Sequence, residues 1–248
     1  MEILGYSERG VINSLFYEMK FSQNNLQLLS DFLSMISFPY REVKFKLTDA
    51  MVLIEQSFSD FGDADLVLLL NNNGNKQVIF IEAKVKTVQK QEWTIKNAFE
   101  QLQEGIRQNK VSSSNLFIQI YHKHRLSQTL QCDDGLNQLK NGVKFPKYSS
   151  KENRRIESNE VVLKAVNLLA PYCGDVLFVA LVPDFTSNLD SFYEKDLKNY
   201  SPEEFPEWKV QNWGYLSWEK VEAFCRDKKL KGTLKIFEWN KGQIYGKR

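Results

Sequence analysis

Two apolar runs around an Asn-Gly pair constrain the fold of this chain more than any other feature. Residues 66–70 (Leu-Val-Leu-Leu-Leu) and 78–81 (Val-Ile-Phe-Ile) flank a polar segment that contains Asn73 and Gly74. Strand-length aliphatic runs on either side of Asn-Gly predict a β-hairpin with a two-residue turn. Because the turn sets which residues face each other, this interpretation also predicts the register of the whole hairpin.

Charged residues cluster at the open end of this hairpin. Asp63 and Asp65 precede the first apolar run, and Glu82 and Lys84 follow the second. The predicted register sets Asp65 opposite Glu82 and Asp63 opposite Lys84, with all four on one face. Two opposed carboxylates repel each other unless a cation or a proton lies between them, and carboxylate oxygens are ligands that Mg²⁺ prefers. A nearby lysine can orient or deprotonate a water molecule.

This arrangement resembles the PD-(D/E)xK nuclease superfamily, because sixteen residues separate Asp65 from Glu82-Ala83-Lys84 at the end of an apolar strand. The tripeptide Asp/Glu-x-Lys occurs six times in the chain. Only the Glu82 copy stands at the end of a predicted apolar strand, and only this strand follows a strand that begins with acidic residues. The resemblance implies that Asp65 and Glu82 bind Mg²⁺ or Mn²⁺, with the backbone carbonyl of Ala83 as a possible further ligand. It implies that Lys84 assists the attacking water.

Other acids near the motif remain open alternatives. Ala64 stands where the family has its proline, and Asp63 is an alternative first metal ligand. In the resembling family an opening helix sometimes contributes an extra acid, a role that Glu8 or Glu18 could fill. The competing interpretation is that both are ordinary acids in the first turn or on the solvent face of a helix.

Hydrophobic periodicity predicts the order helix, three strands, helix, strand over about residues 1–122. This order matches the αβββαβ core of the resembling superfamily, which is restriction endonuclease-like, with a mixed central sheet flanked by helices. The residues His122-Lys123-His124 follow the last of these predicted strands, and polar residues at the end of a strand are commonly solvated. Besides the hairpin, the expected elements are helices within 8–36 with a break near 22–25, a strand from 51 toward 58, a helix over 91–110 and a strand over 116–121.

The remaining residues predict a C-terminal α/β extension over 156–248, so that residues 1–248 form a single domain. No internal repeat, low-complexity tract or linker divides the chain. The expected elements are a helix over 161–169, a strand over 176–182, and a strand over 213–216 that leads into a helix.

A basic stretch over 140–155 is the first candidate for contact with DNA. Basic side chains neutralise phosphates, and the interleaved Phe145 and Tyr148 can stack on unpaired bases. The alternative is that this stretch is only a solvated connector between elements of the fold. Gln101, in the predicted helix after the strand that ends at Glu82, is a second candidate for contact with DNA. The alternative is that Gln101 is an ordinary surface amide. The basic residues are Lys140, Lys144, Lys147, Lys151, Arg154 and Arg155.

Composition sets broad limits. The 248 residues are 42% hydrophobic and 26% charged, which is ordinary for a globular protein, and the net charge of +2 says little about nucleic acid. No apolar run approaches the roughly 18 residues of a membrane span, and the N-terminus lacks a signal-peptide pattern. Three widely spaced cysteines predict a reduced, cytoplasmic setting.

These features predict a nuclease that hydrolyses DNA with Mg²⁺ or Mn²⁺. One alternative is a catalytically inactive protein of the same fold that binds nucleic acid or serves in assembly, because a fold does not determine function. Another is an unrelated α/β protein in which Lys84 simply pairs with Asp63 at a solvent-facing hairpin end.

Overall fold

A computed structural model describes residues 4–88, 91–108, 110, 112–140, 156–200 and 210–246. The chain is an α/β protein built on a five-stranded mixed sheet with strand order β1-β2-β3-β6-β7. Strands β1 to β3 are antiparallel, and β3, β6 and β7 run parallel. The strands are β1 Leu47–Ser57, β2 Asp63–Asn72, β3 Asn75–Ala83, β6 Val176–Val182 and β7 Trp213–Ser217, beside a separate short ribbon of β4 Thr87–Val88 and β5 Gln91–Glu92.

The predicted hairpin is confirmed as β2 and β3. Asn73 and Gly74 have φ angles of 52° and 84°, the positive values that a type I′ turn requires at both central positions. Asn72 pairs with Asn75, and the ladder continues in the predicted register as far as Leu66 opposite Ile81.

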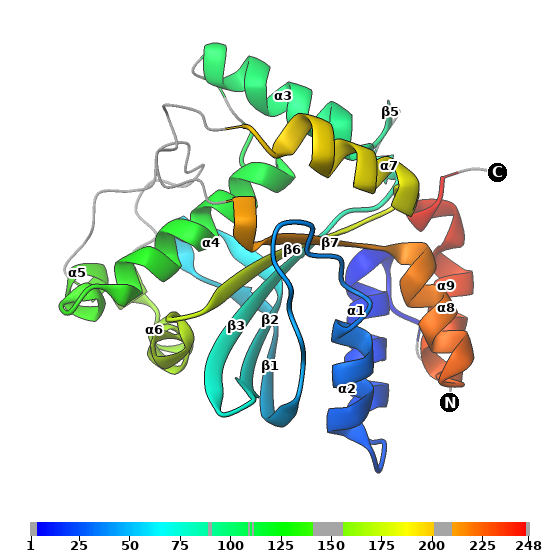
Figure 1. The fold of residues 1–248 in the computed structure, drawn as a ribbon, viewed down its shortest axis with the longest axis horizontal. Helices are drawn as coiled ribbons and strands as arrows, with labels where there is room; N and C mark the ends of the chain where they lie inside the picture. The colour runs from blue at the N-terminus through cyan, green and yellow to red at the C-terminus, as the bar shows by residue number, and fades with distance from the viewer. Residues whose placement is uncertain are drawn as a thin grey trace.

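Helices cover both faces of the sheet because successive side chains of β2, β3 and β6 alternate between two apolar cores (Figure 1). Helices α1, α2, α8 and α9 pack on one face, and α3, α4, α6 and α7 pack on the other. The helices are α1 Ser7–Lys20, α2 Asn25–Leu33, α3 Ile95–Arg107, α4 Leu116–Gln131, α5 Gly135–Lys140, α6 Glu160–Leu169, α7 Thr186–Phe192, α8 Trp218–Asp227 and α9 Lys231–Ile244.

The strand predicted over 116–121 is wrong, because these residues begin α4. Asn115 caps this helix by accepting a hydrogen bond from the backbone N–H of Phe117 at 3.0 Å. Eleven of the sixteen residues of α4 are buried, so the helix lacks the polar face from which helical periodicity is read. The strand that follows the helices is β6, and the fourth and fifth strands of the sheet therefore lie within the predicted C-terminal extension.

Most other predicted elements are confirmed. The helices expected within 8–36, 91–110 and 161–169 are α1, α2, α3 and α6. The strands expected near 51–58, 176–182 and 213–216 are β1, β6 and β7. Within the described ranges, no helix is long and apolar enough to cross a membrane.

The turn of the hairpin gives a direct test of this register. Gly74→Ala places a side chain at a φ of 84°, which we expect to lower the free energy of unfolding by about 1–2 kcal/mol. A Cβ at this position meets no atom within 4 Å, so the loss reports backbone strain alone. Urea denaturation measures the effect. Gly174→Ala is the control, since a Cβ there also meets open space but without the positive φ, and an equal loss in both variants would contradict the turn assignment.

Candidate functional site

The candidate site lies where the ladder between β2 and β3 stops. The last paired residues are Leu66 and Ile81. Just beyond them, Asp65 Oδ2 accepts a hydrogen bond of 2.8 Å from the backbone N–H of Ala83. The Asp65 side chain therefore bridges the two strands at the point where their backbones no longer pair.

Asp63 is not placed opposite Lys84 as predicted. Asp63 pairs with Ser57 of β1 and is exposed to solvent. Its backbone carbonyl accepts a hydrogen bond of 2.8 Å from Lys123 Nζ. Of the two acids at the start of β2, Asp65 is therefore the one beside β3.

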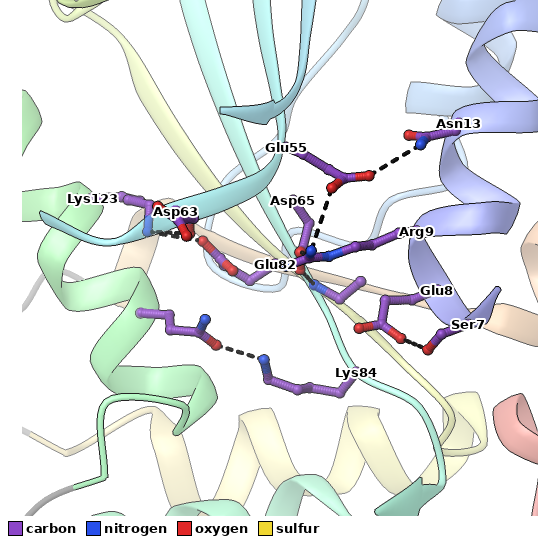
Figure 2. A network of polar contacts seen from close by, with 12 residues as sticks. Ser7, Glu8, Arg9, Asn13, Glu55, Asp63, Asp65, Glu82, Lys84 and Lys123 are labelled. Atoms are coloured by element: carbon purple, nitrogen blue, oxygen red, sulfur yellow. Dashed lines mark hydrogen bonds and ion pairs between the residues drawn. The ribbon is translucent and has the colours of Figure 1, made fainter. Parts of the chain in front are cut away.

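Glu82 is the most deeply buried acid of the site. It pairs with Ala180 of β6, and its side chain is fully buried. Glu82 Oε1 lies 3.1 Å from Lys123 Nζ (Figure 2). Apart from this ion pair, neither carboxylate oxygen has a hydrogen-bond partner among the described residues. Burial raises the pKa of Glu82 to about 7, although the positive charge of Lys123 opposes the rise.

Lys84 is held by three elements around the end of β3. Its Nζ donates a hydrogen bond of 2.5 Å to Gln119 Oε1 on α4, so the predicted alternative of a pair with Asp63 is not what the structure shows. Its backbone N–H donates to the carbonyl of Leu181 in β6 at 2.9 Å. Its carbonyl accepts a hydrogen bond of 2.7 Å from Trp218 Nε1 on α8.

Helix α4 supplies one polar partner to each of two candidate site residues, Glu82 in β3 and Lys84 just after it. Gln119 contacts Lys84, and Lys123 contacts Glu82. Residues four apart lie about 6 Å from each other along a helix face, which is close to the roughly 6.6 Å between residues two apart on a strand. The matched spacing lets a straight helix serve two neighbouring side chains of the strand.

Helix α1 brings charge to Asp65 from the other side. Arg9 Nε lies 4.0 Å from Asp65 Oδ1, and Arg9 Nη1 lies 3.3 Å from Glu55 Oε2. Glu55 has a φ of 51°, a left-handed conformation that is uncommon for a residue other than glycine, and Asn13 of α1 also donates to it. Figure 2 shows Glu8 beside this group. Burial raises the pKa of Asp65 and the negative charge of Glu8 adds to the rise, whereas Lys84, the Ala83 hydrogen bond and Arg9 lower it.

Glu18, the other candidate acid of the opening helix, lies outside the site. Its carboxylate accepts hydrogen bonds from the backbone N–H groups of Gly232 and Thr233 at 3.2 and 2.8 Å. These groups belong to the first turn of α9, whose unpaired N–H groups need acceptors. Glu18 therefore caps a helix.

The predicted DNA-contact residues are only partly described. Gln101 is exposed on α3, and none of the hydrogen bonds found in the described part of the chain links it to the acids. Lys140 ends α5, but its side chain lies outside the described residues. The other basic residues of this stretch also lie outside them: Lys144, Lys147, Lys151, Arg154 and Arg155.

The donor groups fit a divalent metal ion held mainly by two carboxylates. The described residues contain no group of three or more His, Cys, Asp or Glu side chains arranged to hold a metal. Mg²⁺, however, is usually held by one or two carboxylates together with water. Asp65 and Glu82 supply two carboxylates, and apart from the Lys123 ion pair the buried Glu82 oxygens have no hydrogen-bond partner in the ranges that the structure describes. Ala83, whose carbonyl is the predicted further ligand, lies between Glu82 and Lys84.

Three residues of the site were not predicted from the sequence. These are Arg9, Gln119 and Lys123, which contact Asp65, Lys84 and Glu82 respectively. The available signal was the four-residue spacing of Gln119 and Lys123, since i and i+4 share a helix face. That signal applies only once residues 116–131 are known to be helical.

Comparison with protein-family models, with curated proteins and with solved structures found no match to this chain.

The raised pKa of Glu82 predicts a pH dependence of stability. The folded pKa of about 7 exceeds the ordinary value of 4.5, so the folded state binds the proton more tightly than the unfolded state. Stability from this group is therefore present below about pH 4.5 and is lost as the pH rises through about 7. In metal-free buffer, we expect the free energy of unfolding of the wild type to fall relative to that of Glu82→Gln over this window. Urea denaturation at several pH values measures it, and parallel curves would contradict the assignment.

Proposed function

We propose that this protein is a metal-dependent DNA nuclease of the PD-(D/E)xK type. The observation that carries the proposal is the meeting of Asp65, Glu82 and Lys84 at one end of the β2–β3 hairpin, where the buried Glu82 carboxylate pairs with Lys123 and has no other hydrogen-bond partner in the described part of the chain. A buried carboxylate is costly to keep, so a site that retains one beside a second acid and a lysine is better explained by chemistry than by stability.

Asp65 and Glu82 would hold the metal ion, with the carbonyl of Ala83 as a possible further ligand. Mg²⁺ or Mn²⁺ bound there would supply Lewis-acid stabilisation of the negative charge on a phosphodiester. Glu8, at the start of α1, is close enough to influence Asp65 by its charge and remains a candidate for an additional acid.

The cations of the site can act on the substrate directly. Lys84 is partly buried and held by Gln119, so its ammonium group is fixed in position to orient a water molecule or to stabilise a developing negative charge. The Arg9 side chain is 54% exposed next to Asp65, and a guanidinium group matches the geometry of phosphate oxygens. The basic stretch over 140–155 remains the predicted contact for the rest of the DNA.

One observation favours a second candidate, a nuclease-like fold that binds nucleic acid or serves in assembly without cutting. Lys123 already neutralises Glu82, and no third acidic or imidazole ligand joins the two carboxylates in the described ranges. A site of this kind can persist without metal. The two candidates differ in whether DNA is cleaved.

The decisive test is cleavage of supercoiled, linear and single-stranded DNA in Mg²⁺, Mn²⁺ or EDTA. We expect metal-dependent cutting by the wild type, and a loss of about 100-fold or more for Glu82→Ala, which removes a metal ligand, and for Lys84→Ala, which removes the group that orients the attacking water.

A second copy of the tripeptide provides matched controls. Glu42 and Lys44 have the same spacing but lie on the surface, with side chains 75% and 85% exposed. Glu42→Ala and Lys44→Ala should therefore cut like the wild type. DNA binding without metal-dependent cutting would favour the non-catalytic candidate, and the absence of both would sink the proposal.

A further inference from the structure

Lys123 is a fully buried charged side chain for which the proposed chemistry has no role. Its Nζ lies 3.1 Å from Glu82 Oε1 and donates a hydrogen bond of 2.8 Å to the carbonyl of Asp63. Lysine is almost never fully buried in proteins unless it is paired. The ammonium group therefore has two fixed partners, one at the start of β2 and one at the end of β3.

The turn at Gly62, just before β2, lies close to this ammonium group. Gly62 has a φ of 76°, and a Cβ built on it would lie 3.3 Å from Lys123 Nζ. A larger residue would be strained in its backbone and would crowd the lysine. The close approach of this turn to Lys123 thus depends on glycine.

Stability alone is a poor explanation for this pair. Removing two charges from water is costly, and replacing a buried ion pair with apolar side chains is often neutral or stabilising. Most of the buried residues of α4 are apolar or aromatic, so an apolar residue would suit the same core.

The two acids of the site each face a different cation. In Figure 2 the Glu82 carboxylate extends toward Lys123, and Arg9 approaches Asp65 from α1. A metal ion shared by both acids would bring its positive charge close to the buried ammonium group. Because like charges repel strongly where water is excluded, the ion and Lys123 compete for Glu82.

We propose that Lys123 is an internal counter-ion that positions Glu82 and competes with the metal ion, so that removing its charge strengthens metal binding. This inference rests on the proposed function, because it takes Glu82 to be a metal ligand. A purely structural lysine would have the opposite effect, since its loss would leave Glu82 less well positioned and weaken the binding of metal.

The test is titration of the EDTA-stripped, 248-residue protein with Mn²⁺ at pH 8, measured by isothermal titration calorimetry. Lys123→Met removes the charge and keeps much of the side-chain volume. We expect it to bind Mn²⁺ about tenfold more tightly than the wild type, or more, because a nearby positive charge is lost. Lys123→Gln also removes the charge but keeps a donor for the Asp63 carbonyl, so it provides a second variant if the methionine form does not fold. Lys164→Met is the control, since it removes a charge from an exposed side chain on α6 and should leave affinity unchanged.

Unchanged or weaker Mn²⁺ binding by folded Lys123→Met or Lys123→Gln overturns the inference. Glu82→Ala separates this failure from failure of the proposed function. If the wild type binds Mn²⁺ and Glu82→Ala does not, the metal site stands whatever Lys123 does. If neither the wild type nor the Lys123 variants bind Mn²⁺, the metal site and the inference fail together.

Discussion

The burial of the Glu82 carboxylate is the constraint on which the site depends. An ionised carboxylate without water must have a cation nearby, and the fold brings one from α4 to within 3.1 Å. Placing Lys123 there requires α4 to cross the sheet at the end of β3 and requires the turn at Gly62 to approach it closely. The helix, the turn and the strand therefore have to be positioned together, and Gln119 reaches Lys84 as a result of the same placement.

The hairpin could be predicted from the sequence because its turn is encoded locally. Asn73 and Gly74 select the turn, and the turn sets the register up to Leu66 and Ile81. Beyond that point the ladder does not continue to Asp63 and Lys84, because the backbone N–H of Ala83 donates to the Asp65 side chain instead of to the backbone of β2. The turn sequence does not report where such a side-chain contact replaces backbone pairing.

The cationic half of the site could not be predicted, because it depends on α4. A helix that is buried on nearly every side has no polar stripe, and a short apolar run such as residues 116–121 also fits a buried strand. A strand over 116–121 predicts a solvated strand end at Lys123, whereas the helix buries this residue in the core. The acids were easier to predict, since Asp65 and Glu82 lie at the open end of a hairpin whose turn has a clear sequence signal.

The way Lys84 is anchored has a consequence for the order of folding. The β2–β3 hairpin closes through local contacts, but the end of β3 is held by Leu181 and by Trp218, which is 134 residues further along the chain. Closing so large a loop costs entropy before any contact repays it. During synthesis the ribosome therefore completes both acids long before it makes the residues that fix the lysine, and we expect the site to remain unassembled on the growing chain until α8 has emerged.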